Sequence, residues 1–245
     1  MTTGQLEEKK KIGNGIEILY EDAHVLVCYK PAGIPVQSAG MRIKDMVSIL
    51  KVYRMEHEKK PGEPYIGVVH RLDQPVQGVI VFAKTKQAAA SLSAQVAGDK
   101  NGKQAEKIYL AVVDKKAESD VPQEAELTDW LLKDGRTNTS RVVSKGTKDA
   151  RESRLFYRIL EEKDEQALVE VHLFTGRHHQ IRVQLSAAGM PIVGDQKYHP
   201  APTREPLALC AANLSFRHPQ TGKAMCFSIN PQGGAFDRFR QNTKN

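Results

Sequence analysis

The chain has 245 residues, of which 40% are hydrophobic, so it can build one sizeable core or two small ones. Lysine and arginine exceed aspartate and glutamate by seven, and the isoelectric point of about 9.2 favours a polyanionic partner. No window is apolar for long enough to span a bilayer, and residues 1–11 lack the core of a signal peptide, so we expect a cytoplasmic protein. The three cysteines are too widely spaced for a disulfide framework or a zinc site, and we expect reduced core residues at Cys28, Cys210 and Cys226.

Short strands and two helices are predicted in the first half of the chain. Asp45 and Thr85 are typical helix N-caps, and Gly98 is a typical helix stop before a polar loop over 99–104. The predicted elements are a polar leader (1–15), strands at 16–20 and 24–29, a helix after Asp45, strands at 65–69 and 79–83, and a helix after Thr85.

The second half is predicted to consist mainly of strands. Val169, Val171 and Leu173 alternate with polar residues, which is the period of a half-buried sheet. Successive strands over 106–174, a helix over 179–188 and a final hairpin of 207–216 with 224–229 complete the prediction. Short connections between adjacent strands indicate mostly antiparallel pairing, so we expect an α+β fold. We expect one domain over residues 16–245.

An acidic residue lies on a loop between two apolar runs, 65–69 and 79–83. Pro75 and Gly78 interrupt strand pairing there, so Asp73 is predicted to be displayed on a rigidly framed loop, where catalytic groups are often found. The local pattern alone favours a turn in which Asp73 is a cap and Arg71 its ion-pair partner, because aspartate is common in turns.

A basic segment covers residues 137–148. It carries Arg141, Lys145 and Lys148 and no acidic residue, so it can lie against phosphate groups. A solvated, mobile hairpin is an equally good interpretation of this pattern.

Five segments together resemble a known family. His70-Arg71-Leu72-Asp73 with its following strand, and Gly176-Arg177-His178-His179-Gln180-Ile181-Arg182 with the later Gly194-Asp195 turn, resemble the signatures of RluA-type pseudouridine synthases. Weaker matches over 18–33, 107–113 and 214–222 occur in the family's order. The chain departs from the family at Val76-Gln77, where Thr or Ser followed by Ser is usual, and at His178, where Thr is usual. Neither departure removes the acidic residue.

The resemblance implies that residues 16–245 form a catalytic domain with a mixed, mostly antiparallel central sheet flanked by helices. It also implies an isomerase that converts uridine in RNA to pseudouridine without a cofactor. The partner would be tRNA or ribosomal RNA, and we expect a monomer with no metal. Many relatives carry an N-terminal RNA-binding module of the S4 type, for which the residues before Ile16 are too few. We therefore expect the catalytic domain itself to select the RNA.

The resemblance assigns the chemistry to Asp73, Tyr109 and Arg182. Carboxylates act on glycosidic bonds either as nucleophiles or by stabilising charge and accepting a proton, and both routes stay open for Asp73. Burial would raise the pKa of an isolated carboxyl group, so a nearby cation is needed, and the family pairs the residue matching Arg182 with its catalytic aspartate. Tyr109 matches the tyrosine that contacts the base. By pattern alone, Arg182 is a surface helix residue and Tyr109 a packing residue.

Access to the bond requires the uridine to leave its stack, and Arg71 matches the arginine that fills the vacancy. Structural ion pairing is its alternative role. His70 alone is better explained as orienting or structural. The resemblance places the following residues at the substrate: His70, Arg177, His179 and Gln180.

Two other functions were weighed against an RNA isomerase. A metal-dependent hydrolase would use His70, Asp73, His178 and His179, but adjacent histidines on a helix point about 100° apart and do not readily share one ion. A catalytically inactive RNA-binding module of the same fold is the second alternative. The intact Asp73 argues against it, and the altered Val76-Gln77 keeps it open.

Overall fold

A computed structural model describes residues 10–38, 44–58, 61–98, 104–115 and 120–240. Residues 1–9 of the predicted leader and 99–103 of the predicted loop lie outside the described residues. The chain divides into two compact units. Unit 1 comprises residues up to Ala105 together with Leu214–Ile229, and unit 2 comprises Glu106–Asn213 together with the residues from Asn230 onward. Each unit is described by itself.

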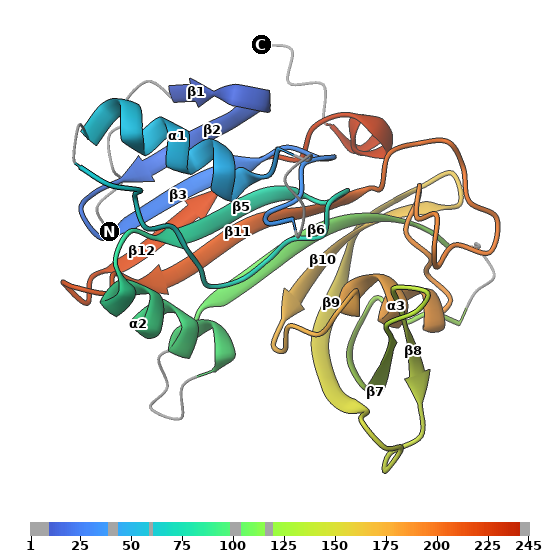
Figure 1. Ribbon diagram of the computed structural model, residues 1–245. Coiled ribbons are helices and arrows are strands. Elements are labelled where there is room, and N and C mark those ends of the chain that lie inside the picture. Colours follow the sequence, from blue (N-terminus) through green and yellow to red (C-terminus); the bar gives the residue numbers. More distant parts are fainter. Residues whose placement is uncertain (1–9, 39–43, 59–60, 99–103, 116–119, 241–245) are drawn as a thin grey trace. The chain divides into compact units, whose positions relative to one another are not determined.

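Unit 1 is a small antiparallel sheet with two helices (Figure 1). The strand order is β1-β2-β3-β5, with β4 and the end of β11 both next to β5, and β12 next to β11. The elements are β1 (Lys10–Ile12), the 3-10 turn η1 (Gly13–Gly15), β2 (Ile16–Glu21), β3 (Val25–Lys30), α1 (Met46–Glu58), β4 (Gly67–Val68), β5 (Gln77–Ala83), α2 (Lys86–Ala97), the end of β11 (Leu209–Arg217) and β12 (Ala224–Ser228).

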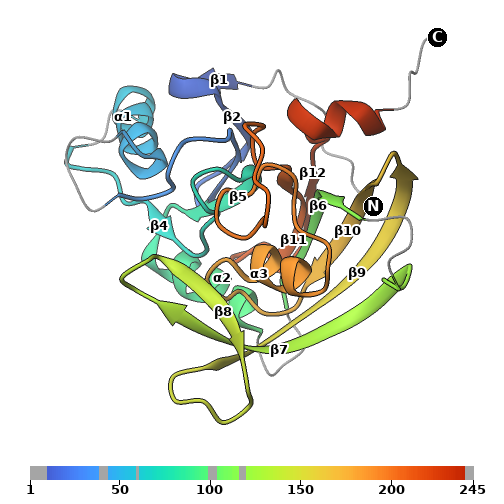
Figure 2. The same cartoon turned by 90° about the vertical axis from the view of Figure 1, so that its right-hand side faces the viewer.

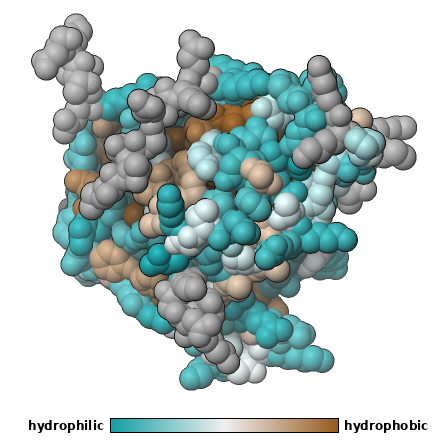
Figure 3. All heavy atoms as spheres, turned by 90° about the vertical axis from the view of Figure 1, so that its left-hand side faces the viewer, coloured by the Kyte–Doolittle hydropathy of each residue, from teal (hydrophilic) through white to brown (hydrophobic). Residues whose placement is uncertain are grey.

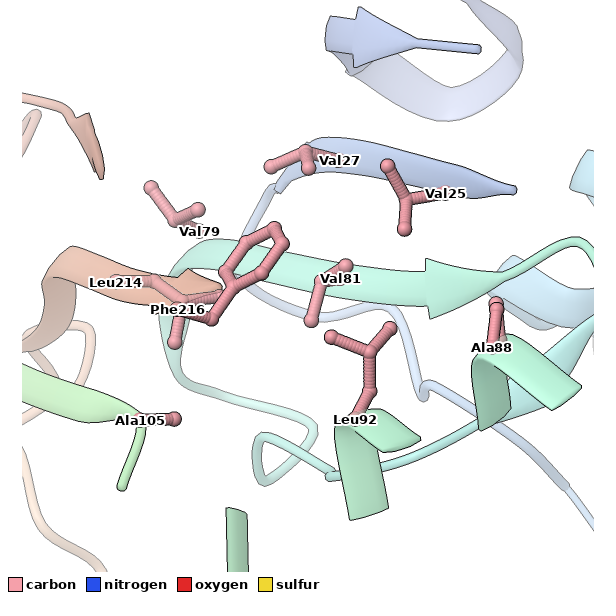
Figure 4. Close-up of a cluster of buried hydrophobic side chains, with 10 residues drawn as sticks. Val25, Val27, Val79, Val81, Ala88, Leu92, Ala105, Leu214 and Phe216 are labelled. Atoms are coloured by element: carbon pink, nitrogen blue, oxygen red, sulfur yellow. The ribbon is translucent and has the colours of Figure 1, made fainter. Parts of the chain in front are cut away.

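The core of unit 1 forms where α2 packs on this sheet. Figure 4 shows Leu92 and Ala88 of α2 pointing toward Val81 of β5, with Phe216 of β11 beside them. These side chains are at most 5% exposed. Burying one large aliphatic or aromatic side chain contributes about 1.5–3 kcal/mol. The cluster therefore holds β5 in place, and β5 fixes the C-terminal end of the loop that carries Asp73.

Unit 2 contains a second antiparallel sheet and one helix. Its strand order is β11-β6-β10-β9-β7-β8, and its printed registers are all antiparallel. The β7–β8 hairpin lies beside α3 (Figures 1 and 2). The elements are β6 (Glu106–Asp114), β7 (Glu124–Asp134), β8 (Thr139–Val143), β9 (Arg151–Lys163), β10 (Gln166–Leu173), α3 (Gln180–Ala187), the start of β11 and the 3-10 helix η2 (Gly234–Phe239).

The structure confirms the predicted class and most predicted elements. The fold is α+β with a mostly antiparallel sheet and few helices. Thr85 caps α2 by accepting a hydrogen bond from the Ala88 amide at 3.1 Å, and Gly98 ends it with a left-handed backbone. Asp45 likewise accepts from the Ser48 amide at the start of α1.

Three details differ from the prediction. Residues 10–15, expected within an irregular leader, form β1 and η1. Gly78 lies inside β5 rather than before it. Cys28 and Cys210 are buried as predicted, but Cys226 is exposed, because residues along β12 alternate in exposure and Cys226 lies on the outward side.

One face of the molecule carries mainly polar groups. The face in Figure 3 is mostly hydrophilic, with smaller apolar areas between polar residues. Of the large apolar side chains that are exposed, Val52 and Met55 both lie on α1. Within the described residues, no helix has the length and apolar character required to cross a bilayer.

Candidate active site

The loop between β4 and β5 displays Asp73 in unit 1. Leu72 is 5% exposed and anchors the loop, whereas the side chain of Asp73 is half-buried and that of Arg71 is exposed. The Val76 amide donates to the Asp73 carbonyl at 3.0 Å, which closes a tight turn. The carboxylate of Asp73 is therefore held on a fixed turn, as predicted, with Arg71 two residues before it.

A buried lysine holds this turn from behind. Lys30, the last residue of β3, is fully buried, and its Nζ donates to the carbonyl oxygens of Pro31, Gln74 and Val76 at 3.0, 3.0 and 2.7 Å. An ammonium group has three hydrogens and no acceptor, so these three carbonyls use its full donor capacity. Two of the carbonyls, those of Gln74 and Val76, belong to the turn that begins at Asp73.

Lys30 also brings a positive charge close to Asp73. Burial lowers the pKa of Lys30 to about 8, and the negative charge of Asp73 opposes that lowering. The cations expected near Asp73 from the sequence were Arg182, on the resemblance, and Arg71, on the local pattern. Lys30 was missed because it lies at the end of a strand 43 residues earlier, although the Lys30-Pro31 pair was part of a weaker match to the family.

The segment after Lys30 completes the frame. The Gly33 amide donates to the Gln74 carbonyl at 2.8 Å, and the Gln74 side-chain amide donates to the Gly33 carbonyl at 3.0 Å. Gly33 has a φ of 89°, a left-handed backbone that favours glycine. Two segments far apart in sequence thus fix each other.

The two departures before the loop glycine lie in the interior. Val76 and Gln77 are 2% and 7% exposed, and Gln77 Oε1 accepts from the Tyr29 hydroxyl at 3.2 Å. His70 Nε2 accepts from the Val81 amide at 3.2 Å, which matches the orienting or structural role considered for it. Val76 and Gln77 therefore lie on the buried side of the loop and support it from the interior.

Unit 2 contains a buried ion pair at the predicted arginine. Arg182 on α3 donates from Nε and Nη2 to the two oxygens of Asp195 at 2.8 and 2.7 Å. Both side chains are nearly or fully buried, at 5% and 0% exposure. The interpretation of Arg182 as a surface helix residue is wrong, because α3 is buried on nearly all sides over its first turn and a half.

The Asp195 carboxylate is stabilised in its charged form. Burial would raise its pKa, but the hydrogen bonds and charge of Arg182, with the amides of Lys197 and Tyr198, hold the pKa below its usual value. Asp73 belongs to unit 1 and Arg182 to unit 2, and their predicted pairing stays a prediction. Asp195 was quoted only as part of a turn motif, and its role as the partner of Arg182 was missed.

The turn before Asp195 requires glycine. Gly194 has a φ of 76°, and a Cβ there would overlap the carbonyl oxygen of Pro206 and lie 2.6 Å from that of Glu205. The backbone of 205–206 therefore packs directly on Gly194 and fixes the position of Asp195.

The residues at the start of α3 are largely occupied with local contacts. Gln180 is 3% exposed; its oxygen accepts from the Thr175 hydroxyl and the Arg177 amide, and its NH₂ donates to the Arg154 carbonyl. Arg177 is exposed and donates to the Glu152 carbonyl at 3.0 Å. Gln180 thus shapes the segment in which Arg177 lies, and substrate binding by both stays a prediction.

Strand β6 carries the predicted tyrosine. Tyr109 is 8% exposed and pairs with Val171 of β10. Lys107 lies two residues earlier, so its side chain is on the same side of β6, and burial lowers its pKa. The sequence analysis did not identify Lys107 as a site residue, although the matched segment begins with it.

The predicted basic segment forms the second strand of the β7–β8 hairpin and the loop after it. Arg141 lies on β8, and Lys145 and Lys148 lie in the loop to β9; all three are exposed. Arg136, at the hairpin turn, adds another exposed cation. This placement is compatible with phosphate contacts and with the solvated hairpin.

Two weaker matches meet in a structural contact within unit 1. His218 Nε2 donates to Asp22 at 2.7 Å, while His218 Nδ1 accepts from the amides of Gln220 and Thr221. Asp22 also accepts from the amides of His24 and Val25, and together these bonds hold its pKa low despite the opposing effect of burial. These residues fix turns and are not candidates for chemistry.

The proposed metal ligands do not form a cluster. Among the described residues, no group of three or more histidine, cysteine, aspartate or glutamate side chains could hold an ion. The rings of His178 and His179 are stacked at 3.8 Å, with nitrogens directed to Ser140, Asn138 and Tyr198.

The chain resembles known proteins over most of its length. The family model for RNA pseudouridylate synthase matches residues 24–187. The uncharacterized RNA pseudouridine synthase YlyB of Bacillus subtilis is 33% identical over 215 residues, covering 86% of this chain and 68% of the relative. The ribosomal large subunit pseudouridine synthase C of Salmonella typhimurium is 32% identical over 239 residues, covering 93% and 70%.

A solved structure supports the fold. The human RNA pseudouridylate synthase domain containing 4 aligns with a TM-score of 0.71 at 22% identity, covering 87% of each chain. The family match spans parts of both units and includes both Asp73 and Arg182. The chain therefore belongs to the RNA pseudouridylate synthase family, as an RluA-type member of these enzymes that isomerise uridine in RNA to pseudouridine.

Proposed function

We propose that this chain modifies uridine in large-subunit ribosomal RNA and that Asp73 is its catalytic carboxylate. The choice of RNA rests on the names of relatives, which include ribosomal large subunit pseudouridine synthases C and D at 32% identity. Transfer RNA is the alternative substrate. The observation that supports Asp73 is its half-buried position on a turn that Lys30 holds through the Gln74 and Val76 carbonyls.

The reaction needs little more than a positioned carboxylate. The bond between uracil N1 and ribose C1′ breaks, the uracil turns, and its C5 bonds to the same C1′ while the C5 proton moves to N1, so atoms and electrons balance. Asp73 either bonds to the ribose or stabilises its developing positive charge and accepts a proton. A rigid turn reduces the reorganisation needed for either route.

A positive charge lies near Asp73. The Nζ of Lys30 is buried behind the turn, and three hydrogen bonds to backbone carbonyls hold it in place. Arg182 is proposed as a second cation for Asp73, on the match to the family; its bidentate bond to Asp195 would hold it in a fixed orientation.

Other residues are proposed to contact the RNA. The exposed Arg71 would enter the stack vacated by the flipped uridine, at a cost of a few kcal/mol for unstacking. Tyr109 would contact the base. The exposed Arg141, Lys145 and Lys148 would contact the phosphate backbone, so RNA affinity should fall steeply with salt.

A tritium-release assay tests the proposal. Transcribed large-subunit ribosomal RNA labelled at uridine C5 loses label to water when pseudouridine forms. We expect release by the wild type and none by Asp73→Asn, with unchanged melting temperature. Asp164→Asn is a matched control, because Asp164 is exposed on the β9–β10 turn with a φ of 48°, which asparagine tolerates. Equal release by wild type and Asp73→Asn would refute the role of Asp73.

A further inference from the structure

His178 joins the start of α3 to the β7–β8 hairpin. Its Nε2 donates to Asn138 Oδ1 at 3.0 Å, and its Nδ1 lies 2.9 Å from Ser140 Oγ. The Ser140 hydroxyl is also 2.9 Å from the His178 carbonyl, which it can reach as a donor. One side chain thus contacts the turn of the hairpin and its second strand.

A second layer of contacts lies under this one. The His179 ring stacks on that of His178, and its Nδ1 lies 2.8 Å from the Tyr198 hydroxyl, which accepts from the Ser140 amide at 2.7 Å. Lys197 Nζ donates to the Asn138 carbonyl at 2.6 Å. Asn138 and Ser140 are therefore held from both α3 and the 195–198 loop.

Tyr198 connects these contacts to the buried Arg182–Asp195 ion pair. The Tyr198 ring lies 5.2 Å from the Arg182 guanidinium, and the Tyr198 amide donates to Asp195 at 3.2 Å. The hairpin, the start of α3 and the Arg182–Asp195 pair consequently form one connected set of contacts within unit 2.

The hairpin held in this way carries exposed cations. Ser140 is 5% exposed and turned inward, so its neighbour Arg141 on the strand faces outward, and the turn residue Arg136 is also exposed. We refer to the contacts of His178 with Asn138 and Ser140 as the lock. Without the lock, the hairpin would have to become ordered when RNA binds, and that ordering would lower the affinity.

The lock depends on the residue by which this chain departs from its family. A threonine at position 178 has one short hydroxyl group and cannot reach both Asn138 and Ser140. The imidazole has two nitrogens on opposite sides of a ring and does reach both.

We propose that His178 is a positioning residue that fastens the basic hairpin and thereby sets the affinity for the RNA substrate. The inference rests on the proposed function. Phosphate contacts are made equally in the bound substrate and in the transition state, so losing the lock weakens binding and leaves the chemical step unchanged.

The test measures kinetics on transcribed large-subunit ribosomal RNA. We expect His178→Ala to raise KM about five- to tenfold, as the loss of one or two hydrogen bonds predicts, with kcat within about twofold of wild type. His178→Thr, the family's usual residue, should behave like His178→Ala. His178→Asn, which retains a polar group facing Ser140, should recover part of the affinity.

Two controls separate positioning from general damage. His172→Ala removes a histidine of β10 whose ring bonds to Glu170, and it should leave KM unchanged. Asn138→Gly retains the left-handed turn, where Asn138 has a φ of 51°, and should add little to the effect of His178→Ala. Full additivity of these two changes would contradict the lock.

The outcomes are distinguishable from failure of the proposed function. An unchanged KM in both His178→Ala and His178→Thr overturns the inference. A fall in kcat as large as the rise in KM also overturns it. RNA dissociation constants of Asp73→Asn and of Asp73→Asn with His178→Ala test the lock without any turnover. A wild type that releases no tritium would refute the proposed function, while the difference in dissociation constant with and without His178 would still decide the inference.

Discussion

The turn at Asp73 and the Arg182–Asp195 pair hold their charged groups by different means. One buried ammonium binds three backbone carbonyls behind Asp73, so the carboxylate itself stays half-buried. In unit 2, Arg182 binds the carboxylate directly, and Asp195 is fully buried. The first arrangement leaves an acidic group available to a substrate, and the second uses one to orient an arginine.

The two arrangements should therefore differ in how much stability is lost when a charged side chain is removed. A buried ion pair is sensitive to the loss of either partner, because the remaining charge is left without compensation. When a lysine bound to carbonyls is replaced, the carbonyls lose their donors, but these direct hydrogen-bond partners are neutral. Removal of a charge should therefore cost more in unit 2 than in unit 1.

The largest expected effect follows from Arg182→Met. It leaves Asp195 buried and unpaired, so the free energy of unfolding should fall by about 3–5 kcal/mol. Urea unfolding followed by fluorescence of Trp130, the single tryptophan, measures this in unit 2. The double variant Arg182→Met with Asp195→Leu should regain much of the loss, and a single variant of nearly wild-type stability would contradict the comparison.

A somewhat smaller loss is expected for Gly194→Ala. The added methyl group meets the Pro206 and Glu205 carbonyls and occupies a left-handed backbone, so we expect a loss of about 2–4 kcal/mol. Gly146→Ala is the matched control: its φ is 91° and nothing lies within 4 Å of the added carbon, so only the backbone penalty of about 1 kcal/mol applies. Equal losses in both variants would show that packing at Gly194 is unimportant.

The smallest of the three effects is expected for Lys30→Met, at about 1–3 kcal/mol near pH 7, because three carbonyls lose their donor. The pKa of Lys30 falls from 10.5 to about 8 on folding, so between these values the unfolded chain binds more protons. Stability from this group therefore rises with pH across that window. Thermal unfolding should show a larger advantage of wild type over Lys30→Met at pH 9.5 than at pH 7.

The control for that measurement is Lys51→Met. Lys51 is paired with Glu63 in an exposed ion pair, and its loss should change stability little at either pH. An advantage of wild type over Lys30→Met that shrinks as pH rises would show that Lys30 is not held as a desolvated cation.

Local patterns in the sequence predicted the elements and the loop on which Asp73 lies. Thr85 caps the start of α2 and Gly98 its end, and both could be predicted because capping depends on residues within one helical turn. Val169, Val171 and Leu173 are buried because alternation along a strand fixes which side each residue faces.

The contacts that position the charged groups could not be predicted in this way. Lys30 reaches Gln74 and Val76 across more than 40 residues, and no periodicity links them. The helix pattern alone placed Arg182 on the surface, because an arginine beside apolar residues fits an amphipathic helix, whereas the Asp195 loop covers that side of α3. The lock at His178 likewise depends on a hairpin 38 to 40 residues earlier.

The proposed production of pseudouridine in ribosomal RNA through Asp73 can be tested in cells. Pseudouridine would be mapped chemically in large-subunit RNA from cells that lack the gene and carry either wild type or Asp73→Asn. We expect specific positions to regain pseudouridine with the wild type and to stay uridine with Asp73→Asn. Positions restored equally by both proteins would refute the role of Asp73.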